Sequence, residues 1–443
     1  MGRAWQFELS VAECGYMLTV KTVMTLRART ALAVLTCALL TVGLAGPVLA
    51  APDTAVQDTA AQDRALARLL ERRIHDSRIG RNFAMRVIDG ETGRQIYAHD
   101  PDNPQRAASN TKLVVATTAL ATMGPRKTFT TYALRAANGS GMILRGGGDP
   151  LLNRGQIRSL ADRTAAKLKR GAKVVVHLDL DLFYPMRRGP GWTPGYSNYI
   201  LAGVQSLAFY GEHARFPAKD VARVFVSGLR AKGINALLGR TEVGTADSRV
   251  LAKTKGHTVA QSVAVMLSRS ESNIAEVLFR QAAVAAGFRG SWNGGIKATK
   301  KVMTSLGVSM DNVAVYDGSG LSRKDHLTPR FLTEVLRAVK VEQGPRFKAM
   351  FAPYAMPIAG RTGTLATPYG RYDTSPSRCA AGRVQAKTGT LYDAIALSGV
   401  SRTMIGRTLI FSMIINSRPS QYEKLANRRA LDGLAATITG CWK

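Results

Sequence analysis

Residues 106–120 read RAASNTKLVVATTAL, and this stretch with its surroundings decides the fold class. Positions 111–123 combine apolar residues with good helix formers and stop at Gly124-Pro125, a pair that ends helices. Short strand patterns lie far away on both sides, at 83–89 and 94–98 around the hairpin signal Gly90-Glu91-Thr92-Gly93, and at 394–401 and 408–416. Helices mixed with mostly antiparallel strands predict an α+β fold.

The remaining segments supply further elements of the same kind. We expect turns over the glycine-rich residues 138–150, a strand at 174–182, mixed strand and helix at 225–233, and short strands at 313–315 and 384–387. Two helices fit residues 262–288, and a closing helix fits 426–439. The chain shows no internal repeat.

Composition narrows the function classes. Of the 443 residues, 46% are hydrophobic and 21% charged, enough for a sizeable core. The formal net charge of +31 excludes an acidic scaffold and predicts attraction to a polyanion. Lysines and arginines are scattered and aromatics are only 7%, so we expect no nucleic-acid partner. The histidines and cysteines form neither HExxH nor CxxC, so no metal site is expected.

The N-terminus carries the pattern of a secretory signal peptide. Arg27 and Arg29 precede an apolar stretch over 31–44, and Val48-Leu49-Ala50 offers a small-residue cleavage site before Ala51. An uncleaved anchor is the alternative, but the apolar stretch is shorter than the ~20 residues of a spanning helix. Residues 1–50 are therefore predicted to be removed, with 1–23 as a spurious extension upstream of Met24. The protein is expected to be secreted, where wall polymers or the membrane surface supply the polyanion.

Cleavage leaves an even pair of cysteines. Cys14 and Cys37 would be lost with the leader, and Cys379 and Cys441 would remain. An exported protein with two cysteines favours a disulfide between them, and two unrelated free thiols are the alternative.

Ser109 and Lys112 are the first candidates for chemistry. Three residues apart near a helix N-terminus, their side chains share a face. A serine hydroxyl needs an adjacent base to become a nucleophile, and a neutral lysine amine can serve. For that, the lysine pKa must fall from about 10.4 toward neutrality, which burial or a second cation achieves. An N-cap serine beside a solvated lysine is the alternative.

Residues 387–390, KTGT, are the second candidate. Lys387 and Thr388 offer a cation and a hydroxyl to a carboxylate, and Gly389 permits close approach of a ligand. On a strand Lys387 and Thr388 face opposite ways, so a twist or bulge is needed to bring them together. An exposed edge-strand lysine is the alternative.

Residues 270–273, SESN, are the third candidate, just ahead of an amphipathic helix. Helix capping is the alternative, because serine and asparagine are preferred caps. The order of SxxK, the serine motif and KTG is far less expected by chance than any one part, and it is typical of penicillin-recognising serine acyltransferases.

More of the chain agrees with this order. The strings GGGDPLL, SESNIAEVLFR, YDGSGLSRKDHLTP, IAGRTGTL and VQAKTGTLYDAIALSG resemble the D-alanyl-D-alanine carboxypeptidase/endopeptidase family of class C penicillin-binding proteins. The resemblance implies a penicillin-binding/β-lactamase-like transpeptidase domain over 51–130 and 256–443. Residues 131–255 would form a smaller inserted accessory domain, where larger members insert two.

The resemblance also implies a role for each motif residue. Ser109 would be acylated by a D-Ala-D-Ala carbonyl, Lys112 would take its proton, and Ser270 would relay a proton to the leaving group. Substrate would be held by a set of residues on the second and third motifs: Ser272, Asn273, Lys387, Thr388, Gly389 and Thr390. The backbone N–H groups of Ser109 and Thr390 would form the oxyanion hole. No metal or organic cofactor would be needed; stem peptides of peptidoglycan and β-lactams would be the partners.

The second motif departs from the family pattern. Aligned on Ala275-Glu276, Ser272 stands where the family has asparagine, and Asn273 comes one place late. Either Asn273 swings in through a helix irregularity or the site is weakened. A secreted carboxypeptidase or endopeptidase is the leading prediction, and a catalytically weakened envelope protein that binds stem peptide or anionic wall polymer is the alternative. A β-lactamase is disfavoured by the long interval between Ser109 and Ser270.

Overall fold

The computed structural model describes residues 54–443 except 138, 140, 184–187, 197–202, 215, 242–247, 343 and 417–420. The predicted leader over 1–50, with Cys14 and Cys37, lies outside the described residues. The chain divides into Met1–Thr54 and a compact unit Ala55–Lys443, and everything below concerns the second. None of the described helices is long and apolar enough to cross a bilayer.

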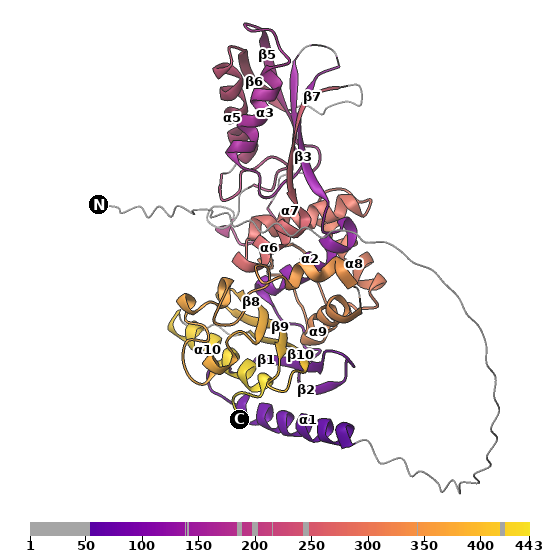
Figure 1. The fold of residues 1–443 in the computed structure, drawn as a ribbon, viewed down its shortest axis with the longest axis vertical. Helices are drawn as coiled ribbons and strands as arrows, with labels where there is room; N and C mark the ends of the chain where they lie inside the picture. The colour runs from indigo at the N-terminus through magenta and orange to yellow at the C-terminus, as the bar shows by residue number, and fades with distance from the viewer. Residues whose placement is uncertain are drawn as a thin grey trace, which may run out of the picture. The chain divides into compact units, whose positions relative to one another are not determined.

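The first sheet joins the two ends of this unit (Figure 1). Its strands are all antiparallel and follow the order β2 (Gln95–His99), β1 (Phe83–Asp89), β10 (Thr408–Asn416), β9 (Ala394–Arg402) and β8 (Val384–Thr390). Both faces are covered, as the alternation of side chains requires. Met85 and Val87 pack in one hydrophobic cluster with α1 (Thr54–Arg73) and α10 (Gln421–Thr439), whereas Ile88 packs in another with α9 (Pro329–Arg337).

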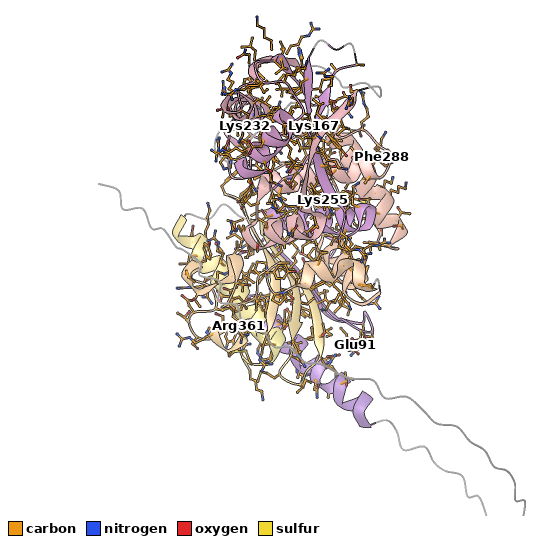
Figure 2. All side chains as sticks on the ribbon, turned by 45° about the horizontal axis from the view of Figure 1, so that its top comes forward. Glu91, Lys167, Lys232, Lys255, Phe288 and Arg361 are labelled. Atoms are coloured by element: carbon orange, nitrogen blue, oxygen red, sulfur yellow. A yellow bond between two sulfur atoms is a disulfide. The ribbon has the colours of Figure 1, made fainter. Side chains whose placement is uncertain are left out.

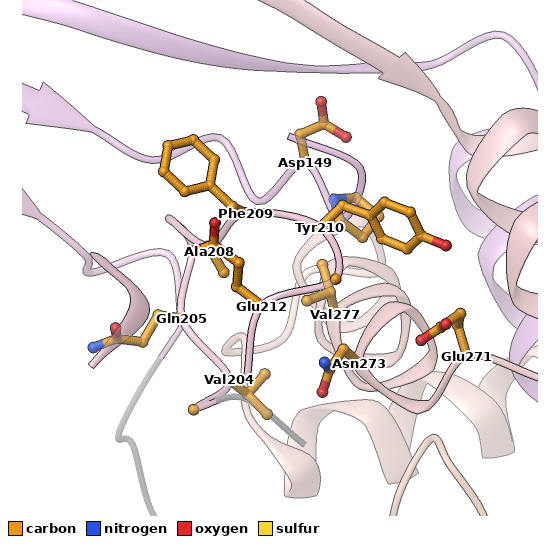
Figure 3. A pocket seen from close by; sticks show the side chains of 13 residues that line it. Asp149, Val204, Gln205, Ala208, Phe209, Tyr210, Glu212, Glu271, Asn273 and Val277 are labelled. Atoms are coloured by element: carbon orange, nitrogen blue, oxygen red, sulfur yellow. The ribbon is translucent and has the colours of Figure 1, made fainter. Parts of the chain in front are cut away.

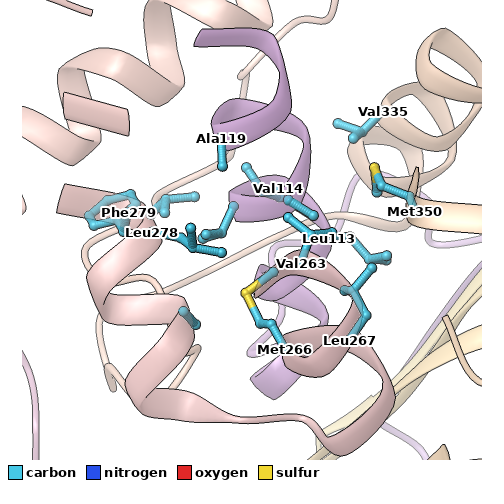
Figure 4. Close-up of a cluster of buried hydrophobic side chains, with 14 of the residues drawn as sticks. Leu113, Val114, Ala119, Val263, Met266, Leu267, Leu278, Phe279, Val335 and Met350 are labelled. Atoms are coloured by element: carbon cyan, nitrogen blue, oxygen red, sulfur yellow. The ribbon is translucent and has the colours of Figure 1, made fainter. Parts of the chain in front are cut away.

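Helix α2 (Thr111–Met123) forms the centre of the helical layer. Its first ten residues are buried, and the surrounding helices are α6 (Val259–Arg269), α7 (Ser272–Ala285) and α8 (Trp292–Ser305). Figure 4 shows Leu113 and Val114 against Met266, Leu267 and Leu278. A helix enclosed in this way is apolar on all sides, which explains the LVVATTAL run. Ser109 and Lys112 are thereby attached to a rigid element.

A second sheet lies between β2 and α6 in the sequence. Its order is β6 (Asn235–Thr241), β5 (Lys173–Asp179), β4 (Met142–Arg145), β3 (Thr128–Arg135) and β7 (Arg249–Thr258). The β4–β5 and β5–β6 pairs are parallel, and the pairs of β3 with β4 and β7 are antiparallel. Helices α3 (Arg154–Ala165) and α5 (Pro217–Ala231) pack on it around a separate core. This sheet occupies residues 128–258, close to the bounds of 131–255 predicted for the insert. That the insert is an independent domain stays a prediction.

Three local predictions were wrong. Residues 138–150 contain strand β4 as well as turns, because Met142 and Leu144 alternate into the second core. Residues 225–233 are mostly helix α5, whose apolar positions recur with helical spacing and pack on the sheet. Residues 313–315 form no strand, and Ala314 makes only an isolated antiparallel bridge to His326.

Short 3₁₀ and π turns complete the path of the chain. Those that bear on the site or its surroundings are η1 (Ala108–Asn110), η2 (Ala338–Glu342), η3 (Gly344–Phe351), η4 (Gly363–Leu365), η5 (Thr367–Tyr369) and η6 (Ser377–Ala380). The structure joins Cys379 of η6 to Cys441 in a disulfide, the pairing that the even cysteine count favoured. This bond ties the last residues of the chain to the segment before β8.

Candidate active site

Ser109 lies in η1, directly before α2, on a strained turn. Ala108 has φ 49°, a left-handed conformation that alanine rarely adopts. The turn is held from behind by Gly320, where a Cβ atom would lie 2.0 Å from the Ala108 carbonyl oxygen. Strain of this kind is concentrated at functional sites. The turn leaves Ser109 half-buried at the start of a fully packed helix.

The amine of Lys112 lies beside the Ser109 hydroxyl. Its Nζ is 2.9 Å from Ser109 Oγ, 2.6 Å from the Ser319 carbonyl oxygen and 3.4 Å from Ser272 Oγ. The side chain is fully buried. One helical turn therefore brings the two predicted residues together, and the alternative of a solvated lysine does not hold.

Burial lowers the pKa of Lys112 to about 8, because the charged amine loses its water. Nearby carboxylates oppose this effect and raise the pKa, with Asp317 first and Glu276 second. The balance leaves an amine that exchanges its proton close to neutral pH. This property is what a general base requires.

Glu276 fixes the backbone segment whose carbonyl oxygen accepts a hydrogen bond from Lys112. Its carboxylate accepts hydrogen bonds from the backbone N–H groups of Gly318 (3.0 Å) and Ser319 (2.8 Å) and from the Trp292 indole (2.8 Å). Glu276 is fully buried, and burial, followed by the charge of Asp317, raises its pKa to about 7. Because the same Ser319 peptide segment carries the carbonyl that accepts from Lys112, Glu276 positions the lysine indirectly.

Asp317 closes the loop of residues 317–322, DGSGLS. Its carboxylate accepts from the Trp192 indole (2.6 Å) and from the backbone N–H groups of Gly320 and Ser322 (both 2.7 Å). Burial, followed by the charge of Asp317, raises the pKa of neighbouring Asp325 well above its usual range. Among these buried acids, Asp317 has the largest charge effect on Lys112.

Ser270 follows α6 in a second strained position. Its φ of 60° makes it a left-handed cap of the helix, a role usually taken by glycine. Its hydroxyl accepts a hydrogen bond from Lys387 Nζ at 2.9 Å. The structure thus places Ser270 between the first and third motifs, beyond the capping role that was its alternative.

Lys387 is fully buried on β8, so the alternative of an exposed edge-strand lysine does not hold. Its Nζ also donates to the Thr388 carbonyl oxygen at 2.8 Å. Burial lowers the pKa of Lys387 well below its usual value, and the charge of Lys112 lowers it further. An anion that enters the site would raise this pKa again, because an opposite charge stabilises the protonated amine.

The KTGT strand is regular, so the bulge that would bring the Thr388 side chain round to Lys387 is absent from this described strand. β8 pairs with β9 in continuous register from Val384 to Thr390, and the Thr388 hydroxyl instead hydrogen-bonds Thr364 at 2.8 Å. The close approach permitted by Gly389 is to the chain itself, because a Cβ there would lie 2.5 Å from the Ala107 carbonyl oxygen. Gly389 therefore lets the strand lie against the Ser109 turn.

The end of the strand meets an arginine from α10. Arg428 Nη2 is 3.4 Å from Thr390 Oγ1. Burial lowers the pKa of Arg428, and the charge of Arg371 lowers it further. This guanidinium adds a second cation to the side of the site that KTGT forms.

Ser272, and not Asn273, faces Lys112. Helix α7 begins at Ser272 and is regular, so the irregularity that could bring Asn273 to the lysine is absent from this described helix. Asn273 instead lines a small cavity of about 30 Å³ with Asp149, Tyr210 and Glu271 (Figure 3). Ser272 offers one weak contact, at 3.4 Å, where the family's asparagine has a larger polar group.

Comparison with known proteins now places the chain. The model of the D-Ala-D-Ala carboxypeptidase 3 (S13) family matches residues 66–207 and 211–438. The chain belongs to this family. The carboxypeptidase DacB of Mycolicibacterium smegmatis is 28% identical over 381 residues, covering 80% of each chain. The D-alanyl-D-alanine carboxypeptidase of an Actinomadura species is 25% identical over 423 residues, covering 74% of this chain and 77% of that protein.

A solved structure shares the fold of this S13 enzyme. Penicillin binding protein 4 from Haemophilus influenzae matches with a TM-score of 0.69 at 19% identity, covering 83% of this chain and 99% of that chain. The prediction of an α+β penicillin-binding fold is thus confirmed, as is the assignment to serine-type D-Ala-D-Ala carboxypeptidases.

Several residues of the site had no predicted role, among them Glu276, Ser319, Thr364 and Arg428. Glu276, Ser319 and Thr364 fall inside the strings that carry the resemblance, but nothing local marks a carboxylate or a carbonyl as a lysine support. Arg428 belongs to a basic helix with no motif. Among the described residues no cluster of His, Cys, Asp or Glu is arranged to hold a metal.

Proposed function

We propose that the protein is an exported serine D,D-peptidase that cleaves D-Ala-D-Ala or crosslinked stem peptides of peptidoglycan through an acyl-enzyme. The observation that carries this proposal is the buried Lys112 amine, 2.9 Å from the Ser109 hydroxyl, with a pKa near 8. The pair supplies a nucleophile and a base without a metal or an organic cofactor.

The proposed reaction has three steps of acylation and one of deacylation. Ser109 Oγ attacks the carbonyl carbon of the penultimate D-Ala and gives its proton to Lys112. The N–H groups of Ser109 and Thr390 stabilise the resulting oxyanion. The peptide C–N bond then breaks, and the proton that Lys112 took from Ser109 passes to the leaving amine by way of Ser270, whose hydroxyl is held by Lys387. Lys112 is thereby neutral again. Water finally hydrolyses the ester and frees Ser109.

The free end of the substrate would lie against β8. Lys387 would bind its carboxylate, and Thr388 would join it only by turning its hydroxyl away from Thr364. Gly389 would keep the strand close to Ser109, and Thr390 would carry the oxyanion donor. Arg428 adds positive charge at Thr390. Charge-assisted hydrogen bonds of this kind are about twice as strong as neutral ones.

The test is covalent labelling of the full chain with a fluorescent penicillin, which forms an ester with the same serine. We expect labelling of the wild type and none of S109A. The matched control is S268A. The Ser268 hydroxyl has no proposed contact with substrate and donates to the Val265 carbonyl oxygen of its own helix. Labelling that survives in S109A would reject the proposed nucleophile.

A catalytically weakened envelope protein is the second candidate, and Ser272 is the observation that favours it. Ser272 lies 3.4 Å from Lys112 and offers one hydroxyl where the family has the amide of an asparagine. Such a protein would bind stem peptide or anionic wall polymer and turn over little. Folded wild type that takes up no penicillin yet binds a D-Ala-D-Ala peptide would support this candidate over the enzyme.

A further inference from the structure

The turn between β9 and β10 presents two apolar side chains to solvent. Met404 is 53% exposed and Ile405 is 64% exposed. The turn is rigid: Thr403 N–H donates to the Arg407 carbonyl (2.8 Å), Arg407 N–H donates to the Thr403 hydroxyl (2.9 Å), and Met404 N–H donates to the Thr439 carbonyl (2.8 Å). An apolar tip fixed in this way does not fold back onto the protein.

Positive charge surrounds the tip. Two adjoining grooves, of about 380 and 430 Å³, share Gly382, Arg383, Arg402 and Gly406. Arg361 and Met404 line one groove, and Lys340 lines the other. No aspartate or glutamate lines either groove, and among the described residues no ion pair neutralises these four cations. Figure 2 shows the Arg361 side chain on the β8–β10 part of the molecule.

We propose that this surface, defined as Met404, Ile405, Lys340, Arg361, Arg383 and Arg402, docks on an anionic lipid bilayer. The apolar pair would enter the interfacial region, and the cations would bind headgroup phosphates, which arginine forks fit well. A soluble polyanion would need the cations alone and gives no reason for two exposed apolar residues beside them. The apolar tip is therefore what favours a membrane over a wall polymer.

The position of the surface agrees with the function proposed above without depending on it. β9 runs from Ala394, beside the KTGT end, to Arg402 at the surface. At about 3.3 Å per residue this strand separates the two ends by roughly 26 Å. A bilayer at the turn would leave the Ser109 site open toward the cell wall.

The test is sedimentation of the full chain with vesicles of phosphatidylglycerol and phosphatidylcholine, compared with pure phosphatidylcholine. We expect binding to the anionic vesicles, about tenfold weaker in M404S/I405S and about tenfold weaker in R383Q/R402Q. The control L237S/L238S changes another exposed pair, 59% and 38% exposed, on the second sheet and should bind as the wild type does.

Three outcomes would overturn the proposal. Equal binding by M404S/I405S and wild type would make the surface a polyanion site, as would full competition by soluble polyphosphate. Equal loss in L237S/L238S would show that exposed apolar area in general, not this turn, drives binding. Thermal melting of every variant reports folding, and penicillin labelling separates failure here from failure of the proposed enzyme activity.

Discussion

Two buried lysines face each other across this site, and their surroundings differ. Lys112 has carboxylates around it, with Asp317 and Glu276 nearest in effect, and they offset part of the cost of burial. Lys387 has no such support, and its strongest charged neighbour is Lys112 itself. Both side chains are fully enclosed. The pKa of Lys112 falls to about 8, and that of Lys387 is held well below its usual value without a carboxylate to oppose the effect.

The difference explains how one residue type serves two purposes. The protein supplies negative charge where the amine must exchange a proton repeatedly. It withholds negative charge where a substrate carboxylate can supply it, because an opposite charge restores the protonated form. Lys387 therefore suits a binding role and Lys112 a base role.

The largest expected effect comes from removing the base. K112A should lower the rate of penicillin acylation by about 10²–10⁴-fold, since general-base contributions are of that size. Stopped-flow fluorescence with the labelled drug measures the rate, and K300A, an exposed lysine on α8, is the matched control. Thermal melting checks that K112A is folded. An unchanged rate in folded K112A would remove this lysine from the mechanism.

Replacing Lys387, the proposed partner of the substrate carboxylate, should have the next largest effect. K387Q should lower kcat/KM for a D-Ala-D-Ala peptide by about 10–100-fold, in line with the loss of a charged hydrogen bond. The same peptide with a C-terminal amide should lose little, because it brings no carboxylate to the lysine. Steady-state hydrolysis of both peptides decides the matter, with K300Q alongside. Equal losses on the two peptides would place Lys387 in another role.

Glu276 offers a way to alter the difference between the lysines without touching either. The acylation rate of the wild type should rise with pH as Lys112 loses its proton, with a midpoint near 8. Ionised Glu276 raises the pKa of Lys112, so E276Q should lower this pKa and move the rise to lower pH. Rate–pH profiles measure the midpoint of the rise. A purely structural role of Glu276 would not move this midpoint to lower pH. E334Q, which loses a carboxylate paired with Arg86, should leave the midpoint in place.

The smallest effect concerns the polar contact of Lys112. S272N should raise turnover about threefold, because the amide can make a stronger hydrogen bond than the 3.4 Å contact of Ser272. S268N controls for the added amide, and hydrolysis of the D-Ala-D-Ala peptide is the measurement. A fall in turnover with unchanged melting temperature would show that the site is adjusted to serine.

Local pattern was enough to predict the elements that carry the motifs. The helix expected at 111–123 has those bounds, and the strands expected at 394–401 and 408–416 end within a residue of β9 and β10. These segments succeed because each has one strong periodicity and clear end signals. Strand β4 was missed because four residues between glycines carry too little pattern, and their place is decided by the core they enter.

The site was predictable only as far as its motifs. Ser109 with Lys112 follows from helix geometry, but the contact of Lys387 with Ser270 joins segments 117 residues apart. Thr388 points away from Lys387, as strand geometry requires, and its partner Thr364 had no assigned role. Glu276 supports Lys112 through the backbone of Ser319, whose carbonyl oxygen accepts from the lysine. A pattern of side chains does not predict such a contact.

The pairing of β1 with β10 has a consequence for synthesis. β1 has only β2 and β10 as neighbours, and β10 lies near the other end of the chain. A chain that emerges N-terminus first must keep the open edge of β1 from aggregating until its partner arrives, while the β3–β4 hairpin can form early from neighbouring residues. The catalytic layer is thus assembled last, and nascent chains cut short of residue 408 are expected to depend on a holding chaperone.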